Sequence, residues 1–479
     1  MQGYYGRTVI YSPVTEITRE NVKDVLDEAV GTHNSNVTQI DFLYNYYRGN
    51  QPIYQREKEI RPEINNTIVE NRAWEIVNFK VGYLVGSPIQ YISRTSDGNV
   101  PENVQMLNSF MWELGKESSD KELVEWQMIC GTSYKLVRQR EEFEDGEPPF
   151  EVIVPDPRNC FVIYSADVDH RPLAGVYFSE DEEGNTVYRV CTKDMFFTVI
   201  DENITVESYP FGVIPLVEYP GNNARMGAFE IVIDLLDQIN TLNSNRIDSV
   251  EQFVQSLLVL YNADIDDSLT ANAIRQAGLI LLKSVGDAKA DVKVLSETLD
   301  QAQTQTLKDD AYNAVLTICS MPNRNSGNGD NGVAVIYRDG WSAAETDAQA
   351  REALYKKSEQ QMLKAVLRIC TDMLGGFDLT VRDIAIKFTR RSYENIETKS
   401  QVFAGLMNTG YVDILDAYTA CDLFPDPEKA AANGKAWHDG QTTSEVQTDT
   451  ATENETVADE VITDDEEGTE STTEVLTEV

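Results

Sequence analysis

The chain has 479 residues, which suffices for about three domains or one large irregular domain and excludes a single small binding module. It carries 40 Lys and Arg residues against 80 Asp and Glu residues, a formal net charge of −40. Proteins hold nucleic acid by neutralising its phosphates with cations. This balance therefore excludes a broad, static grip on nucleic acid and disfavours adhesion to anionic membranes.

The cysteines and the N-terminus indicate a soluble protein made in a cytoplasm. Six cysteines occur with no CxxC spacing and no neighbouring histidine, which argues against a zinc site or a disulfide scaffold and predicts reduced thiols. The N-terminal segment MQGYYGRTVIYSPV lacks the basic and apolar regions of a signal peptide. No window approaches the roughly 18 apolar residues that span a bilayer.

Residues 15–135 are predicted to be mainly helical. Thr18 is a candidate cap for a first helix, Gly49 ends a second, and Pro62 opens a third that continues to Gly86. Apolar residues recur along this third helix at spacings of mostly three to five, which indicates one buried face. They are Ile64, Ile68, Ala73, Ile76, Val77, Val81 and Leu84.

Between about residues 150 and 220 the pattern changes to short β-branched and aromatic runs separated by turn sequences, which predicts an antiparallel meander. One of these turns, EDEEGN at residues 180–185, is typical of a hairpin loop. Its clustered carboxylates are compatible with a calcium site, but an exposed acidic turn is the simpler interpretation.

A long helix is predicted over residues 227–261, with apolar residues at spacings of three or four. Its other faces are too polar to be enclosed on all sides, so we expect one flank to face water. The apolar stripe consists of Val232, Leu235, Ile239, Leu242, Val250, Phe253 and Leu257.

A compact αβ insert is expected at residues 262–296, with a short helix over residues 269–277 and two strand-like runs, LILLK and VKVLS. A second long helix then runs from residue 297 to residue 321, where Pro322 stops it. Residues 323–332 have the composition of a mobile loop, and the strand-like run VAVIYR follows.

The C-terminal part combines helices with a compositional break. Helices are predicted over residues 342–374, 396–406 and 414–420, with a strand-like run at residues 379–388. Residues 441–479 contain 13 acidic residues, 11 threonines and no Lys, Arg or aromatic residue. Few apolar side chains and mutually repelling charges cannot offset the entropy of ordering a backbone, so we expect this tail to be disordered.

No motif supports catalysis. Gly327, Gly329 and Gly332 match GxGxxG, but they follow a helix and precede a strand, the reverse of the dinucleotide-binding order. There is no GxxxxGK[ST], HExxH or GxSxG sequence, and the three histidines are isolated. We therefore expect no enzyme activity, no metal site and no cofactor.

Basic residues gather in the first third of the chain and near its end. They could face nucleic acid, but with twice as many acids available we favour pairing with carboxylates. The residues concerned are Arg48, Arg56, Lys58, Arg61, Arg72, Lys80, Arg382, Lys387, Arg390 and Arg391.

Several segments together resemble the portal proteins of tailed bacteriophages, specifically the SPP1-like family. The most specific are YNYYRGNQPIYQR and RPEINNTIVENRAWEIVNFKVGYLVGSPIQY, followed by the helix–insert–helix arrangement and SGNGDNGVAVIYR before a third long helix. The stretch IKFTRRSYENIETKSQVFAGLMNTGYVDILDAY also looks like the family's C-terminal region. The resemblance covers residues of about 40–430.

The resemblance implies an α+β portal fold with a wing, a stem, a clip and a crown. Carried onto this sequence, it assigns the parts as follows: wing 1–226, stem helices 227–261 and 297–322, clip 262–296, tunnel loop 323–340, a long wing helix and strand 341–392, crown 393–437 and acidic tail 438–479. The tail has no family role that we can map.

The resemblance also implies a ring, usually of twelve copies, at one capsid vertex of the virion, assembled in the host cytoplasm. Its partners would be double-stranded DNA, the terminase large subunit, a head–tail adaptor, and the major capsid and scaffolding proteins, with no membrane. The apolar stripe would pack the stem of the oligomer. The tunnel loop would reach DNA through Asn323, Arg324, Asn325, Ser326, Asn328, Asn331, Val333, Val335 and Arg338.

The composition fits a passive conduit, because a mostly acidic wall repels DNA on average and lets it slide. Two alternatives remain. A nucleic-acid hydrolase with an acidic metal site would show divalent-dependent turnover. A different phage or cellular scaffold or adaptor would be expected to be much shorter and to lack the paired long helices.

Overall fold

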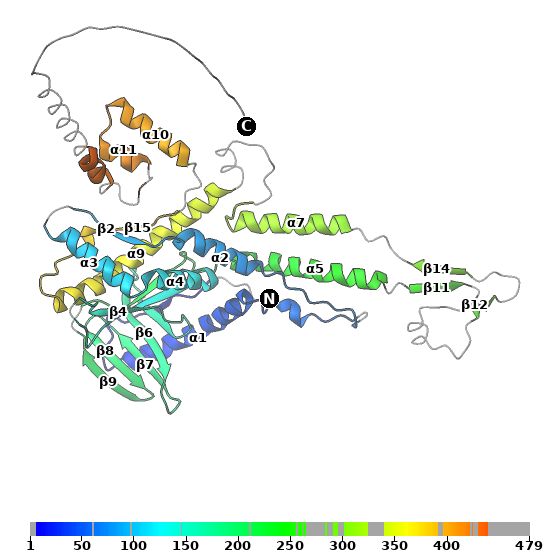
Figure 1. The fold of residues 1–479 in the computed structure, drawn as a ribbon. Coiled ribbons are helices and arrows are strands. Elements are labelled where there is room, and N and C mark those ends of the chain that lie inside the picture. The colour runs from blue at the N-terminus through cyan, green and yellow to red at the C-terminus, as the bar shows by residue number, and fades with distance from the viewer. Residues whose placement is uncertain are drawn as a thin grey trace, which may run out of the picture. The chain divides into compact units, whose positions relative to one another are not determined.

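The computed structural model describes residues 6–59, 62–95, 98–144, 146–209, 212–254, 257–261, 263–264, 283–284, 291–295, 301–323, 340–390, 396–421, 424 and 430–438. The chain divides into two compact units, Met1–Asn395 and Ile396–Val479. The first unit carries every element discussed below except the helical segments that follow residue 395 (Figure 1).

The N-terminal part is mainly helical, as predicted. After β1 (Ile10–Ser12) come α1 (Val22–Tyr47), η1 (Pro52–Gln55), α2 (Arg72–Val85), β2 (Gln90–Ser93), α3 (Val100–Glu113) and α4 (Lys116–Cys130). The first two predicted helices are one, because α1 continues without a break to Tyr47. Its N-cap is Asn21, so the assignment of this role to Thr18 was wrong.

The antiparallel meander is confirmed. It consists of β5 (Cys160–Ser165), β6 (Pro172–Glu180), β7 (Thr186–Cys191), β8 (Met195–Ile200) and β9 (Asn203–Ser208). Each of these strands pairs antiparallel with the next, and a turn joins β6 to β7 at the EDEEGN sequence. β1 adds to the edge of this sheet in parallel with β5, which the sequence pattern did not indicate.

A second sheet has the order β10–β3–β4 and forms from β10 (Leu216–Pro220), β3 (Thr132–Gln139) and β4 (Phe150–Ile153). The first run of the predicted meander, EVIVP, therefore belongs to this smaller sheet, whereas its last run forms β9 of the larger one. The long helix α9 (Trp341–Met373) packs on both β10 and β3. After η3 (Val381–Asp383), β15 (Ile384–Lys387) pairs with β2.

Two long helices leave this region side by side: α5 (Ile233–Val254), preceded by η2 (Glu230–Val232), and α7 (Gln301–Ile318) (Figure 1). Between them in sequence are β11 (Leu257–Tyr261), β12 (Ala263–Asp264), β13 (Lys283–Ser284) and β14 (Asp291–Leu295). β11 pairs with β14, and β12 pairs with β13. The short helix predicted over residues 269–277 lies outside the described residues.

The second unit contains α10 (Ile396–Thr409), α11 (Ile414–Cys421) and a helical segment at residues 430–438. The first two match the predicted helices at 396–406 and 414–420. The acidic tail from residue 439 onward lies outside the described residues.

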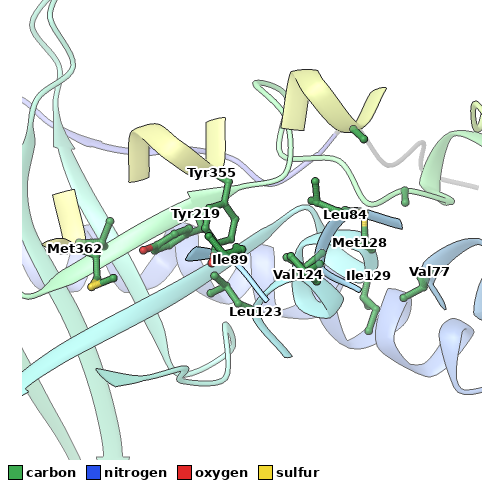
Figure 2. Packing of buried hydrophobic residues seen from close by; sticks show 14 of the residues in the cluster. Val77, Leu84, Ile89, Leu123, Val124, Met128, Ile129, Tyr219, Tyr355 and Met362 are labelled. Carbon is green, nitrogen blue, oxygen red and sulfur yellow. The ribbon is translucent and has the colours of Figure 1, made fainter. Parts of the chain in front are cut away.

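The main hydrophobic core joins α2, α4, α5, α7 and α9 to the smaller sheet. Figure 2 shows part of it, with Val77 and Leu84 of α2 and Leu123 and Val124 of α4 within one continuous cluster. α9 contributes Met362, which is fully buried. Burial of such side chains is the largest favourable term in folding.

A buried polar network sits inside this core. Glu359 on α9 accepts hydrogen bonds of 2.6 Å from the hydroxyls of Tyr91 and Tyr219, and Lys135 donates to it at 3.0 Å. Lys116 of α4 lies 3.1 Å from the same carboxylate. The network connects α9 to α4 and to the three strands β2, β3 and β10.

A second carboxylate, Asp120, balances the network. It receives bonds of 2.7 Å from both Lys135 Nζ and the Tyr355 hydroxyl, and it pairs with Lys116. Two carboxylates therefore face two ammonium groups, and the cluster is neutral. Buried charges are tolerated when they are paired and hydrogen-bonded in this way.

Glu359 is ionised throughout the usual pH range. Burial acts to raise the pKa of its carboxyl, but the charges of Lys116 and Lys135 and the hydroxyls of Tyr219 and Tyr91 outweigh burial and hold the pKa well below its usual range. Burial raises the pKa of Tyr219 and Tyr91 well above the ordinary tyrosine value, so these hydroxyls remain donors.

Replacement of the Glu359 carboxylate should be costly. We expect Glu359→Gln to lower the free energy of unfolding by about 3 kcal/mol at pH 7, because two buried ammonium groups lose a charge partner. Because the folded-state pKa is depressed, the carboxylate stabilises the fold above its unfolded pKa of about 4.3 and loses that contribution as the pH falls further. The difference between wild type and variant, measured by urea denaturation, should therefore shrink below about pH 4.

The matched control is Glu117→Gln on α4, whose side chain is 54% exposed and pairs only with Lys121 at 2.7 Å among the described residues. We expect this control to change the unfolding free energy by less than about 0.5 kcal/mol. Equal effects of the two substitutions would contradict the role of the network.

Candidate functional site

The predicted tunnel loop lies almost entirely outside the described residues. Only Asn323 at its start and Gly340 at its end are described, and the Asn323 side-chain amide lies 3.5 Å from the Asn313 Oδ1 atom of α7. The strand predicted for VAVIYR is not described either. The other loop residues singled out from the sequence fall in the same gap: Arg324, Asn325, Ser326, Asn328, Asn331, Val333, Val335 and Arg338.

The apolar stripe of the first long helix divides into two parts. Val232 and Ile239 are buried in the core of the chain itself, so a neighbouring copy cannot reach them. Leu235 and Leu242 are half-buried, whereas Val250 is 43% exposed. The Phe253 side chain is outside the described set.

The predicted helix was too long at both ends. It begins as η2 at Glu230 and ends at Val254, and Leu257 lies in β11 instead. In the run LLVLY, only the first residue, Leu257, continues the three-or-four spacing of the helix. The run as a whole is a continuous apolar sequence, which is typical of a strand. Its five residues pair with β14, whose backbone supplies the hydrogen bonds.

Residues 62–71, which we call the strap, are not helical, although Pro62 predicted a helix start. The strap runs along α5 with its backbone N–H groups turned toward side chains of that helix. Asn66 donates to Asp248 Oδ1 at 2.8 Å, Ile68 to Ser244 Oγ at 3.0 Å and Glu70 to Asn240 Oδ1 at 2.8 Å.

The spacing of these three bonds has a simple geometric cause. The donors are two residues apart in the strap, and the acceptors are four residues apart in α5. Two residues of extended chain cover about 6.6 Å and four residues of helix cover about 6.0 Å, so the two periods match. The strap and the helix run in opposite directions.

The polar face of α5 is therefore used inside the molecule. Asn240 and Ser244 are 0% exposed and Asp248 is 3% exposed. We expected one flank of this helix to face water, which the exposed residues confirm, but the face that carries these three residues is a different one. Side chains that do face solvent on α5 include Asp234, Gln238, Thr241, Asn245 and Glu251.

Asp248 anchors the start of the strap. Arg56 and Lys58 lie 3.1 Å and 2.9 Å from its Oδ2 atom, and the Asn66 side chain adds a bond of 2.9 Å to Oδ1. Burial acts to raise the pKa of this carboxyl, but the Asn66 backbone N–H and the Lys58 ammonium outweigh burial and lower the pKa.

Glu70 connects the end of the strap to both long helices. Its Oε2 atom accepts from Asn243 of α5 at 2.6 Å and from Lys308 of α7 at 2.7 Å, and Arg72 Nε donates to its Oε1 atom at 2.7 Å. Burial acts to raise the pKa of Glu70, and the bonds from Lys308 and Asn243 lower it by more. The carboxylate remains charged at neutral pH.

Three further contacts hold α7 in place. The guanidinium of Arg72 lies 4.0 Å from the centre of the Tyr312 ring, and the Tyr312 hydroxyl donates to Glu75 at 3.0 Å. Directly between the helices, Arg246 donates to Gln305 at 2.8 Å. The strap, α5 and α7 together form a polar clamp that fixes the relative position of the two helices.

Five of the ten basic residues singled out from the sequence pair with carboxylates, as favoured there, whereas Arg48 lies over the ring of Tyr44. Besides Arg56, Lys58 and Arg72, Lys80 lies 2.6 Å from Asp347, and Arg390 lies 2.8 Å from Glu345. Arg61 and Arg391 are outside the described residues.

Among the described residues, no group of three or more His, Cys, Asp or Glu residues could hold a metal ion. His33 is buried, with its Nε2 atom 2.8 Å from the Arg158 carbonyl. All six cysteines are buried without disulfide bonds, and burial raises the pKa of the Cys130 thiol to about 12. In the same part of the chain, no helix is long and apolar enough to cross a bilayer.

The clamp makes a direct prediction at Ser244. Ser244→Ala removes the acceptor of the partly buried Ile68 N–H, so we expect the unfolding free energy to fall by about 1 kcal/mol and the Ile68 amide to exchange faster with deuterium. Thr241→Ala is the control, because the Thr241 hydroxyl is exposed and, among the described residues, bonds only to the Asp237 carbonyl of its own helix. Equal exchange at Ile68 in both variants would show that the strap is held by other contacts.

Comparisons with known proteins identify the family of this chain. The family profile described as phage portal protein, SPP1 Gp6-like, matches residues 27–426. The portal protein of Bacillus phage SPP1 is 24% identical over 292 residues, which cover 54% of this chain and 55% of the relative. The chain thus matches about half the length of that relative.

Two solved structures, of the neck of an empty GTA particle with C6 symmetry and of a native one with C12 symmetry, are also similar. They share 11% and 10% identity with this chain, each with a TM-score of 0.42, covering 74% of this chain and 90% of the other. The family profile, in contrast, covers well over half of the sequence. The chain therefore belongs to the SPP1 Gp6-like family of phage portal proteins.

Proposed function

We propose that this protein forms a closed ring of identical copies, twelve in number, at one vertex of a phage capsid. Double-stranded DNA passes through the ring during packaging and during ejection. The terminase large subunit docks on it first, and a head–tail adaptor binds later, while capsid and scaffolding proteins surround it. The protein acts as a conduit and catalyses no reaction.

The observation that carries this proposal is the clamped helix pair. α5 and α7 are joined by the strap into one unit, and that unit still exposes apolar side chains. Ile247 is 40% exposed, Val250 43% and Leu307 59%. Exposed apolar residues on a rigid helix pair are suited to contact with identical neighbours in a ring.

In this proposal α5 and α7 form the stem, and the strands between them form the clip. Because β11 pairs with β14, we place the clip boundary at Leu257 rather than at residue 262. The helical and β-sheet region before α5, together with α9, forms the wing. The second unit, with α10 and α11, forms the crown.

Electrostatics support a conduit through which DNA slides. The chain has a net charge of −40. The basic residues of the clamp and of the buried network are paired with carboxylates. A wall with few free cations releases few counterions from DNA and therefore binds it weakly. DNA can then move through the channel without a large energetic barrier.

The stem assignment predicts a defect in assembly. Because Val250 is already exposed, Val250→Asp should leave the monomer folded and place a charge in the contact between neighbours, which we expect to reduce the fraction of assembled ring by about tenfold or more. Native mass measurement reports the assembly, and thermal denaturation reports the fold. Leu235 suits this test less well, because it is half-buried against the core.

Gln238→Asp adds the same charge at an exposed position on another face of α5 and serves as the control. The ring should form normally with it. A Val250→Asp protein that assembles as well as this control would contradict the packing role of the exposed stripe.

The tunnel-loop assignment predicts a defect in packaging. Deletion of Asn325–Gly332 should leave ring assembly intact and reduce the amount of packaged DNA, because these residues are assigned to contact DNA and not a neighbouring copy. Ring mass is the internal control, and nuclease-protected DNA per particle is the readout. Normal genome filling by the deletion variant would overturn the loop assignment.

A further inference from the structure

A groove of 960 Å³ lies between α9 and the ends of β5, β6 and β10, away from the clamp. Its lining mixes polar and charged side chains with apolar ones, among them Val162 of β5, Leu216 of β10 and Leu354 of α9. The volume is in the range of specific binding sites, and the combination of apolar side chains with polar groups is typical of them.

The rim of this groove is cationic. Arg171, Lys193, Lys357 and Lys364 line it and are exposed, and none of them forms an ion pair with another described residue. Lys357 and Lys364 are seven residues apart and so lie on one face of α9. Four cations without an ion-pair partner among the described residues thus share one groove, although the chain as a whole has a net charge of −40.

The carboxylates in the groove do not neutralise these cations. Glu218 is engaged by Arg225, with bonds of 2.6 and 2.9 Å, and by the Tyr164 hydroxyl at 2.6 Å. Asp169 also lines the groove and is exposed. One free carboxylate against four free cations leaves the rim positive, which attracts an anionic partner.

The opposite end of the same sheet is acidic. β6 starts at Pro172 in the groove and ends eight residues later at Glu180, a span of roughly 26 Å at about 3.3 Å per residue. Beyond it, the β6–β7 turn carries Asp181, Glu182 and Glu183, and the β8–β9 turn adds Asp201 and Glu202. We call these two turns the acidic end.

We propose that the cationic groove of one copy receives the acidic end of the sheet of a second copy. The two features lie at opposite ends of one paired sheet and cannot meet within a molecule, but they can meet between molecules. A head-to-tail contact between two different patches is what a closed ring requires. This inference rests on the proposed ring and adds a second contact to the one at the exposed stripe of the stem.

The test uses charge reversal on the full-length protein. Lys357→Glu/Lys364→Glu alters the groove, Glu182→Lys/Glu183→Lys alters the acidic end, and a third protein combines all four changes. Native mass measurement at low and high salt gives the assembled fraction, and circular dichroism with thermal denaturation confirms folding. The control, Lys121→Glu/Arg368→Glu, makes the same charge change at positions 43% and 54% exposed outside the groove.

We expect each double variant to lower the assembled fraction at least about fivefold at low salt, and we expect the combined variant to recover it because the charges are exchanged. A groove variant that assembles like the control overturns the inference. So does a combined variant that fails to recover, which would assign the groove to DNA or to another acidic protein. Wild-type protein that stays monomeric would instead overturn the proposed ring.

Discussion

The structure of the helix pair depends on satisfying three polar groups buried on one face of α5. Asn240, Ser244 and Asp248 are almost fully enclosed, and enclosing them without partners would cost several kcal/mol. The strap meets this requirement with its backbone N–H groups. Two residues of extended chain advance about as far as four residues of helix, so every second N–H of the strap meets every fourth side chain of α5. An irregular segment thereby becomes a fixed part of the helix pair.

The same contacts link the helix pair to the rest of the molecule. Glu70 at the end of the strap reaches α5 and α7 at once, and Arg72 and Glu75 of α2 contact Tyr312 of α7. α2 is itself part of the main core, which the neutral network around Glu359 joins to α9. A load on the helix pair is therefore carried into the core through polar contacts of defined geometry.

Much of the architecture follows from local sequence patterns. Strands β5–β9, the helix α9 and the helices α10 and α11 were predicted from periodicity and turn residues, because each owes its structure to its own sequence. The strap was not, since Ile64 and Ile68 have the spacing of a helix and the true constraint comes from α5, about 180 residues further along. The Glu359 network was missed for the same reason: Lys116 and Asp120 are close in sequence, but Lys135 and Glu359 are not. The predicted apolar stripe proved to be mixed, because periodicity reports burial and does not distinguish the chain's own core from a contact with a neighbour.

The six buried cysteines have a practical consequence for experiments on assembly. All six are enclosed in the folded chain, and burial raises the thiol pKa of Cys130, Cys191 and Cys370 to about 12, so little reactive thiolate is present near neutral pH. A single cysteine introduced at an exposed position would then be the main target of a maleimide dye. Fluorescent probes could be attached to the native sequence without first removing its own thiols, and energy transfer between labelled copies could follow how the particle is built.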